Sequence, residues 1–403
     1  MSSSIVGQIQ DHDETVVIEF DPTSHSHIRV NPLTGENVLC SPHRTKRPWQ
    51  GAVEPPQLDQ RPRYDSKCYL CPGNERAGGI KTEEYDGTFI FENDFAALVE
   101  QKTLNPSTLT NNETKSIDVL FQQESTNGKC FVICFNPRHD LTVAEMNDQE
   151  IENIVNAWTK LYIDVSNQYS FVSYIQIFEN KGSMMGCSNP HPHGQAWSLS
   201  HVPTIPLTMF QKQLQYALTQ ETIPNIPTLT NGLPCLLLTY VQTELDKHHK
   251  GDKDDRVVIV GSDFIVLVPF WAKWPFETMI VPYNEKQDLA HVIGCITRRM
   301  DNLFECSFAY SMGLYQASKY VQDFDLTTVS TKQDDAVKDG ALVSQLHLGF
   351  YPPLLRSSTV KKFLVGFELF AEAQRDITPE QAAQRLRDCH DQHYKQRLNT
   401  NAE

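Results

Sequence analysis

The second half of this sequence repeats, in loose form, the order of strand-like segments in the first half. The segment "SDFIVLVPFWAKWPFETMIVPYN" at 262–284 resembles "NDFAALVE" at 93–100 followed by "FVICFNPRHD" at 131–140, with the residues between them lost. A helical pattern follows in each half, because apolar residues recur at i, i+3, i+4 and i+7 over 151–165 and a second helical segment falls near 287–304. The sequence therefore predicts two copies of one strand-rich unit with a helix.

Local signals place further elements and the boundary between the two copies, which we expect near 203–225. The segment "RVNPLTGENVLCSPHR" indicates two short strands about a Thr-Gly turn, and Asn127-Gly128 between two β-rich runs favours a hairpin. The apolar runs "LPCLLLTYV" and "DFIVLVPFWA" are interpreted as buried strands. A last helix is predicted to begin after Thr378, with Pro379 at its first position and a glutamine completing a capping box.

Charge and cysteine content limit the partners and the compartment. The 403 residues carry a net charge of −15, which argues against nucleic acid because phosphate backbones bind broad basic surfaces. Ten cysteines without dense regular spacing are typical of free thiols in a reducing cytosol. The N-terminus lacks a secretory pattern, and no apolar run reaches the roughly 18 residues that a membrane-spanning helix needs. We expect a cytoplasmic protein with no nucleic-acid or membrane partner.

Two histidines separated by one proline, in "GCSNPHPHGQAW" at 186–197, are the strongest chemical signal. Pro192 disfavours helix and lacks a ladder donor, so we expect an extended segment at a sheet edge. Residues i and i+2 share a face, which would place His191, His193 and Gln195 side by side. Two half-exposed surface histidines are the alternative, but the small residues before them would let backbone N–H groups approach an anion. An imidazole beside an anion site suits nucleophilic phosphoryl transfer.

Cys68 and Cys71 are the one cysteine pair with a metal-ligand spacing. In a cytosolic chain this spacing predicts two zinc thiolates, and the alternative, a redox dithiol, normally accompanies a βαβ pattern that is absent here. The other ligands must be histidine or carboxylate, and His139 and His191 are candidates that spacing alone does not select from 14 histidines.

Basic side chains gather in the segments "SPHRTKRPWQG" and "TVKKFLVGFE". A solvated face is the usual explanation of such patches. In a chain this acidic, they could instead contact phosphate oxygens through charge-assisted hydrogen bonds. The residues concerned are Arg44, Lys46, Arg47, Lys361 and Lys362.

Long motifs run nearly end to end, among them "NPLTG", "CYLCPG", "FENDFAAL", "FENKGSMMGCSNPHPHGQAW", "PFWAKWPFET" and "FYPPLLRSSTVKKFLVGFE". In these motifs the sequence resembles the galactose-1-phosphate uridylyltransferase family of the histidine-triad superfamily. The resemblance implies an α+β fold of two histidine-triad-like halves, each an antiparallel sheet with packed helices, in a homodimer. Residues 1–203 would carry a zinc site and the nucleophile, and residues 204–403 would complete the substrate site across the dimer.

The reaction implied by this resemblance transfers UMP from UDP-glucose to galactose 1-phosphate by ping-pong steps, in galactose metabolism. The residue at the position of His193 attacks the α-phosphorus, glucose 1-phosphate leaves, and galactose 1-phosphate takes the uridylyl group from the histidine. An imidazole with its ordinary pKa of about 6.5 is available as a neutral nucleophile near neutral pH. Gln195 stands where related hydrolases carry histidine, and its amide would hold the phosphate without activating water.

The resemblance also implies the other site residues. Ser188, with the backbone of Gly186 and Cys187, matches a phosphate cradle, and Asn180 matches a residue that supports the intermediate. The Zn²⁺ ligands would be Cys68, Cys71, His139 and His191. The positions that match nucleoside-, phosphate- and sugar-contacting residues, some reaching across the dimer, are Asn93, Asp94, Arg44, Arg47, Lys362, Phe363, Glu368 and Gln374.

A second metal site, which many relatives build from one glutamate and three histidines, is predicted to be lost. Its positions hold Met209, Tyr315, His347 and Gly349, so a single ligand remains. We therefore expect one Zn²⁺ per chain. Phe367 also replaces a tyrosine near the substrate, and an acidic insert lies near 323–340.

Two alternative functions stay open. One is another superfamily activity, such as a dinucleoside polyphosphate phosphorylase, and label retained from UDP-glucose on denatured protein would distinguish it. The other is a catalytically silent nucleotide-sugar-binding relative, which the lost metal ligands suggest. The presence of Ser188, His193 and Gln195 counts against a silent relative.

Overall fold

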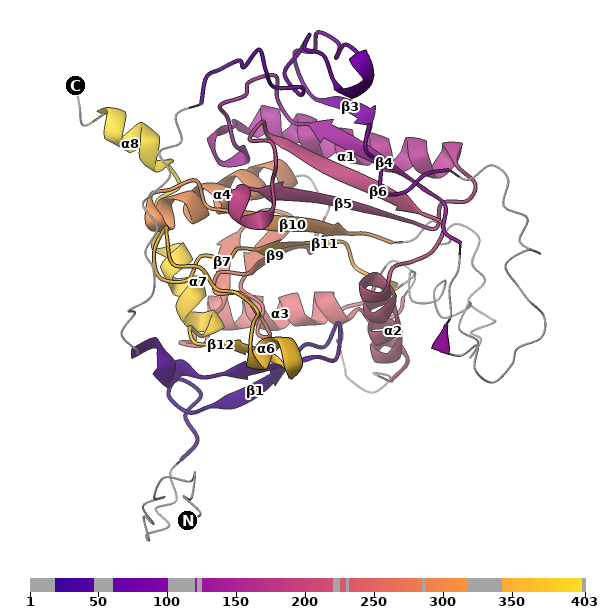
Figure 1. Cartoon of the computed structure of the whole chain (residues 1–403). Helices are drawn as coiled ribbons and strands as arrows, with labels where there is room; N and C mark the ends of the chain where they lie inside the picture. The colour runs from indigo at the N-terminus through magenta and orange to yellow at the C-terminus, as the bar shows by residue number, and fades with distance from the viewer. Residues whose placement is uncertain are drawn as a thin grey trace, which may run out of the picture.

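An antiparallel sheet of nine strands runs through the part of the chain described by the computed structural model, which covers residues 19–46, 61–100, 120–121, 125–219, 225–229, 232–284, 288–317 and 343–400. Its strand order is β3-β4-β6-β5-β10-β11-β9-β8-β7 (Figure 1). The first half supplies β3 (Phe89–Glu92), β4 (Gly128–Cys134), β5 (Tyr174–Lys181) and β6 (His193–Leu199). The second half supplies β7 (Val257–Val260), β8 (Phe264–Leu267), β9 (Thr278–Pro282), β10 (Tyr310–Tyr315) and β11 (His347–Tyr351).

The two halves join edge to edge where β5 pairs with β10, from Tyr310 opposite Lys181 to Leu314 opposite Ile177. A smaller sheet lies beside the large one and brings the two ends of the described chain together. In it β1 (His27–Val30) pairs with β2 (Asn37–Cys40), and β2 pairs in parallel with β12 (Ala373–Arg375). The predicted α+β fold of two antiparallel strand sets with packed helices is confirmed.

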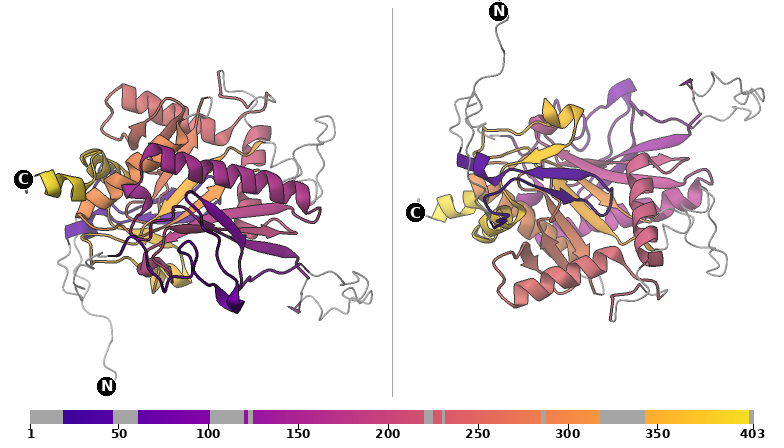
Figure 2. Two further views of the ribbon diagram at one scale, coloured as in Figure 1. Left: turned by 90° about the horizontal axis from the view of Figure 1, so that it is seen from above. Right: turned by 90° about the horizontal axis from the view of Figure 1, so that it is seen from below.

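Helices cover the sheet unequally (Figures 1 and 2). One core contains α1 (Asp148–Gln168), α4 (Leu289–Phe304) and α7 (Pro379–Arg387) together with strands of both halves. A second core packs α2 (Thr204–Thr219) and α3 (Leu236–His249) on the other face of the second half's strands. Along β8 the residues alternate between these two cores, which explains its uninterrupted apolar sequence.

The same alternation leaves one face of the first half for polar groups. In β6 every second residue is buried, beginning with Gly194, and the residues between them are half-buried. Ala196 of β6 and Ile177 of β5 belong to the core beneath α1. The opposite face of these two strands therefore carries His193, Gln195 and Trp197. Two short helices, α6 (Phe367–Phe370) and α8 (Tyr394–Thr400), complete the described α-helices.

Signals that depend on a few neighbouring residues are confirmed. The periodic segment 151–165 lies within α1, and the segment near 287–304 forms α4. Thr378 caps α7, accepting from the backbone N–H of Gln381, whose side chain returns the hydrogen bond. No helix in the described ranges has both the length and the apolar character needed to cross a bilayer.

Two local predictions were wrong. The run "LPCLLLTYV" begins α3 instead of forming a strand, because Leu237, Val241 and Leu245 recur every four residues and are buried on one helix face. The hairpin predicted at Asn127-Gly128 is not found among the residues that the structure describes, where β4 pairs with β3 on one side and β6 on the other. Gly128 serves close packing, because a Cβ there would lie 2.3 Å from the Ser198 carbonyl oxygen.

A buried ion network ties the first strand to the last long helix. Glu380 of α7 accepts from Arg29 of β1 (Nη1 to Oε1, 2.8 Å) and from Arg256 before β7 (2.7 Å). Arg256 also pairs with Glu244 of α3, and both guanidinium groups lie over the ring of Phe270. Burial alone would raise the pKa of Glu380, but the hydrogen bonds and charge of the two arginines lower it from 4.5 to about 2.

This network predicts an acid-sensitive contribution to stability. Because the folded-state pKa of Glu380 is lowered, its carboxylate stabilises the fold above about pH 4.5, and the contribution is lost as the pH falls toward about 2. Glu380→Gln should reduce the free energy of unfolding by on the order of 3 kcal/mol at neutral pH and by clearly less near pH 3. Urea denaturation at both pH values measures this. Glu36→Gln, which breaks an exposed pair with Lys273, is the control and should change little. A loss from Glu380→Gln that is equal at both pH values would contradict the prediction.

Candidate active site and metal centre

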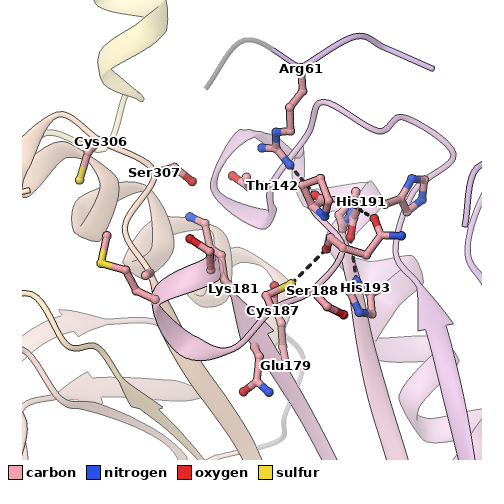
Figure 3. A pocket seen from close by; sticks show the side chains of 18 of the residues that line it. Arg61, Thr142, Glu179, Lys181, Cys187, Ser188, His191, His193, Cys306 and Ser307 are labelled. Atoms are coloured by element: carbon pink, nitrogen blue, oxygen red, sulfur yellow. Dashed lines mark hydrogen bonds between the residues drawn. The ribbon is translucent and has the colours of Figure 1, made fainter. Parts of the chain in front are cut away.

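A cavity of about 790 Å³ opens at the end of β5, where the chain turns into β6 (Figure 3). Its walls come from the β5–β6 connection on one side and from segments after α4 and after β11 on the other. Five predicted site residues with different expected roles line it together: Asn180, Cys187, Ser188, His191 and His193. The cavity volume falls within the range of small-molecule sites.

The imidazole of His193 is held by one hydrogen bond. Its Nδ1 lies 2.8 Å from the carbonyl oxygen of His191 (Figure 3). A carbonyl can only accept, so Nδ1 carries the proton and Nε2 of the neutral ring keeps a lone pair. Burial lowers the pKa of His193, and the hydrogen bond to the His191 carbonyl partly opposes this shift.

The position of β6 differs from the sequence-based expectation. It is an interior strand between β4 and β5, not an edge strand. Pro192 precedes it in a bend, so the missing N–H removes no ladder bond, and its carbonyl accepts from Phe135 N (2.9 Å). Gly194 is required next, because a Cβ there would lie 2.8 Å from the Phe135 ring. A proline just before the strand and a glycine within it therefore let His193 enter a packed sheet.

The connection from β5 to β6 contains two glycines with positive φ, Gly182 (87°) and Gly186 (77°). Gly186 N–H donates to Ser183 (3.1 Å), and Cys187 N–H donates to Gly182 (3.3 Å). Both donors are therefore used within the connection in this structure, and their contact with phosphate stays a prediction. The exposed side chain of Ser188 remains at the cavity wall.

Asn180 and its neighbours make contacts with the second half. The Asn180 Oδ1 accepts from Ser311 Oγ of β10 (2.7 Å), which leaves its amide N–H groups available. Lys181 pairs with Asp301 of α4 (2.8 Å), and the other oxygen of Asp301 lies 3.2 Å from His393 Nε2. The start of the β5–β6 connection is thereby tied to α4 and to the C-terminal segment.

Three charged residues of the cavity were not predicted. Glu179 accepts from the Tyr310 hydroxyl (3.0 Å), and burial raises its pKa to about 7. Lys181 and Arg61 also line the cavity, and Arg61 donates to the Pro190 carbonyl. Glu179 and Lys181 lie within the motif "FENKG", which could have drawn attention to them, whereas no sequence signal marks Arg61.

Lys361 of the second basic segment also lines this cavity, whereas the other predicted contact residues do not. Asp94 follows β3 beside Asn93 and pairs with Arg76 (3.7 Å). Lys362 Nζ donates to Glu368 (2.6 Å) and to the Gln374 carbonyl, so these three form one cluster at α6 and β12. Phe363 is 61% exposed near this cluster, and Arg44 pairs with Asp376 at 3.5 Å. Arg47 lies outside the described residues.

Four buried side chains from three distant segments converge beside the cavity. Ligand atoms of Cys68, Cys71, His139 and His191 all lie within 4.8 Å of one another. Cys71 Sγ is 3.5 Å from His139 Nδ1 and 3.6 Å from His191 Nδ1. Metal–sulfur bonds of about 2.3 Å and metal–nitrogen bonds of about 2.0 Å in a tetrahedral zinc site place these atoms about 3.5 Å apart. The cluster therefore fits a metal ion with two thiolate and two imidazole ligands.

A hydrogen-bond chain sets the tautomer of one imidazole. The Tyr85 hydroxyl donates to the Leu70 carbonyl (2.6 Å), so it accepts from His191 Nε2 (3.0 Å). The lone pair of His191 then lies on Nδ1, the atom facing Cys71. Burial raises the pKa of the Cys71 thiol to about 11, so metal binding would release its proton. No other group of three or more potential ligands is found among the described residues.

Positions expected to form a second metal site do converge. Met209, Tyr315 and His347 line one small cavity of about 10 Å³. The Tyr315 ring stacks on His347 with 4.7 Å between centroids. A Cβ at Gly349 would lie 2.7 Å from the Tyr351 hydroxyl oxygen. Among the residues that the structure describes, one histidine nitrogen is the potential metal ligand at this place, beside a thioether and a phenol.

Comparisons with known proteins identify the family. The family description "Galactose-1-phosphate uridyl transferase, N-terminal domain" matches residues 18–203, and its C-terminal counterpart matches residues 210–398. A Saccharomyces cerevisiae galactose-1-phosphate uridylyltransferase is 43% identical over 94% of this chain and 99% of its own length. A Drosophila melanogaster protein named as a probable one is 43% identical over 93% and 99%, and a Haemophilus influenzae one is 40% identical over 94% and 98%.

Solved structures share the fold. An ADP-glucose phosphorylase from Arabidopsis thaliana with bound ADP-glucose has a TM-score of 0.62 at 18% identity, covering 91% of this chain and 99% of its own. A uridylyltransferase structure has a TM-score of 0.58 at 22% identity, covering 90% and 97%. By class, the curated relatives are nucleotidyltransferase enzymes. The chain belongs to the galactose-1-phosphate uridylyltransferase family.

Proposed function

We propose that this protein transfers UMP from UDP-glucose to galactose 1-phosphate through a uridylyl-histidine. The lone pair of His193 Nε2 attacks the α-phosphorus, an N–P bond forms, and the P–O bond to glucose 1-phosphate breaks. A phosphate oxygen of galactose 1-phosphate then attacks the same phosphorus, the N–P bond breaks, and UDP-galactose is released. Neither step needs a strong general acid, because a sugar phosphate is already a good leaving group.

One observation carries this proposal: the His191 carbonyl fixes the protonated nitrogen of His193, which leaves Nε2 as an unprotonated nucleophile in a ring that lines the cavity. Ser188 and Asn180 lie in the same cavity with polar groups for phosphoryl oxygens. The names of relatives at 40–43% identity support galactose 1-phosphate as a substrate and a uridylyl group as the group transferred.

Mass spectrometry of the intact protein tests the proposal. After exposure to UDP-glucose, the denatured chain should be heavier by one uridylyl group, and galactose 1-phosphate should remove the group and yield UDP-galactose. ADP-glucose with inorganic phosphate is the control pair, because a phosphorylase shares the fold. Binding of UDP-glucose without adduct or turnover would favour a silent relative, and discharge to inorganic phosphate would favour a phosphorylase.

We propose Zn²⁺ as the metal of the Cys68, Cys71, His139 and His191 cluster. Two thiolates and two imidazoles are a frequent donor set of structural zinc sites. The ion would cross-link the segment before β3, the segment after β4 and the bend before β6. One such ion per chain is expected, since the cavity of Met209, Tyr315 and His347 offers too few ligands for a second.

We also propose that the protein is a homodimer with shared sites, in which residues 204–403 of one chain complete the substrate site formed by residues 1–203 of the other. The Lys362, Glu368 and Gln374 cluster does not line the cavity of His193. Beside it lies a strongly apolar surface, whose side chains are 55–86% exposed: Phe363, Val365, Phe367, Leu369 and Phe370. A partner subunit would cover this surface and receive the cluster at its own cavity.

Mixing two inactive variants tests the shared site. His193→Ala and Lys362→Ala, unfolded and refolded together, should regain about a quarter of wild-type activity, because half of the dimers are mixed and each mixed dimer has one intact site. Mixing His193→Ala with Ser188→Ala is the control, since both residues lie in one chain's cavity. No recovery with Lys362→Ala, or equal recovery in the control, would contradict the proposal. Light scattering gives the oligomeric state.

A further inference from the structure

Trp197 of β6 contacts the amide of Gln195, two residues before it on the same strand face. Its indole Nε1 lies 3.2 Å from Gln195 Oε1. The oxygen and nitrogen ends of a glutamine amide are often exchangeable, but an indole N–H can only donate. The carbonyl end of the amide must therefore face Trp197, and the NH₂ end must point away from it.

The indole itself is well held. Its ring meets Phe178 edge to face, with 5.7 Å between ring centroids. Phe178 of β5 lies opposite Gln195 in the sheet, and Gln176 lies opposite Trp197. Within the described ranges, the indole N–H is the one hydrogen-bond partner found for the Gln195 side chain. Trp197 therefore decides which end of the amide is presented to the rest of the face.

The two orientations of the Gln195 amide would interact very differently with an anion. With Oε1 bound to the indole, the Gln195 NH₂ is available on the face that also carries His193. Such an N–H can donate to an anionic phosphoryl oxygen, and the bond strengthens as charge develops. A flipped amide would turn oxygen lone pairs toward the phosphoryl oxygens and set its NH₂ against the indole N–H, which is unfavourable on both sides.

We propose that Trp197 is a positioning residue for uridylyl transfer, which holds the Gln195 amide so that its NH₂ faces the phosphoryl group carried by His193. The inference rests on the proposed function. Trp197 acts through Gln195 and contributes no group to the reaction. The indole N–H of Trp197 is needed as well as the size of its side chain, because a phenylalanine would fill much of the same space but could not donate a hydrogen bond.

A double-mutant cycle tests the positioning role. Trp197→Phe should slow the single-turnover transfer of the uridylyl group to His193 by about tenfold, with little change in the KM for UDP-glucose or in the unfolding temperature. In a Gln195→Ala background the same substitution should have no further effect. Trp158→Phe is the matched control, because its buried indole N–H in α1 has no hydrogen-bond partner among the described residues.

Equal slowing by Trp197→Phe in the wild-type and Gln195→Ala backgrounds would indicate a packing role and would overturn the proposal. An unchanged transfer rate for Trp197→Phe in the wild-type background would also overturn it. NMR supplies a measurement that needs no catalysis. The indole ¹H–¹⁵N resonance of Trp197, assigned by its loss in Trp197→Phe, should move upfield in Gln195→Ala, and an unmoved resonance would also overturn the proposal. Absence of any uridylyl adduct on the wild type would instead defeat the proposed function, so the two failures are distinguishable.

Discussion

Replacing His193 with alanine is expected to reduce uridylyl transfer to below about one thousandth of the wild-type rate, because the variant lacks the nitrogen that forms the covalent bond. The fold should persist, since the ring is only half-buried and its one hydrogen bond goes to a backbone carbonyl. The measurements are the steady-state exchange rate, the mass of the chain after exposure to UDP-glucose, and the unfolding temperature.

The control is His201→Ala, because this exposed histidine lies two residues after the end of β6 and does not line the cavity. This variant should keep both the activity and the adduct. An exchange rate of His193→Ala well above one thousandth of the wild-type rate would mean that another group accepts the nucleotide. The same conclusion would follow if the variant still gained the mass of one uridylyl group.

Cys71→Ser is expected to remove the bound metal and to lower the unfolding temperature together. Cys71 is fully buried and faces both imidazoles of the cluster, so its replacement removes one of the four metal ligands. Metal binding supplies about 10 kcal/mol or more in small zinc domains, although a large core makes this chain less dependent on it. Elemental analysis gives the metal content per chain, and calorimetry gives the unfolding temperature.

Cys134→Ala is the matched control. Cys134 is as deeply buried as Cys71 and packs in the same small hydrophobic cluster, but it is outside the group of four ligands. It should keep one zinc ion per chain. A full zinc content in Cys71→Ser would refute the ligand assignment, and two ions per wild-type chain would refute the loss of the second site.

Elements with local signals could be predicted from the sequence, and elements decided by distant packing could not. The capping box of α7 needs only Thr378 and Gln381, which lie three residues apart. The run that begins α3 is apolar enough for a buried strand or a buried helix, and the choice depends on its packing against β8 and β9. Gly128 resembled a turn glycine because its close neighbour, Ser198, lies 70 residues away.

The residues of the candidate site likewise include some with local sequence signals and some that are placed by distant contacts. Cys68 and Cys71 were recognisable by spacing, and family resemblance was needed to select His139 and His191. Arg61 reaches the cavity by contacting the carbonyl of a residue 129 positions away, so no local pattern marks it. The hydrogen bonds that the N–H groups of Gly186 and Cys187 make within the β5–β6 connection could not be predicted, because they depend on the folded backbone.

The shared sheet has a consequence for any attempt to divide this protein. The hydrogen bonds between β5 and β10 occupy the outer edge of the very strand that leads into the His193 connection. A fragment ending near residue 203 would expose that edge at the five β5 residues that pair with β10, next to an unshielded part of the common core. Unpaired strand edges pair with other chains, so such a fragment should self-associate. Genetic fusions or split reporters are therefore better inserted in surface loops than at the boundary between the two halves.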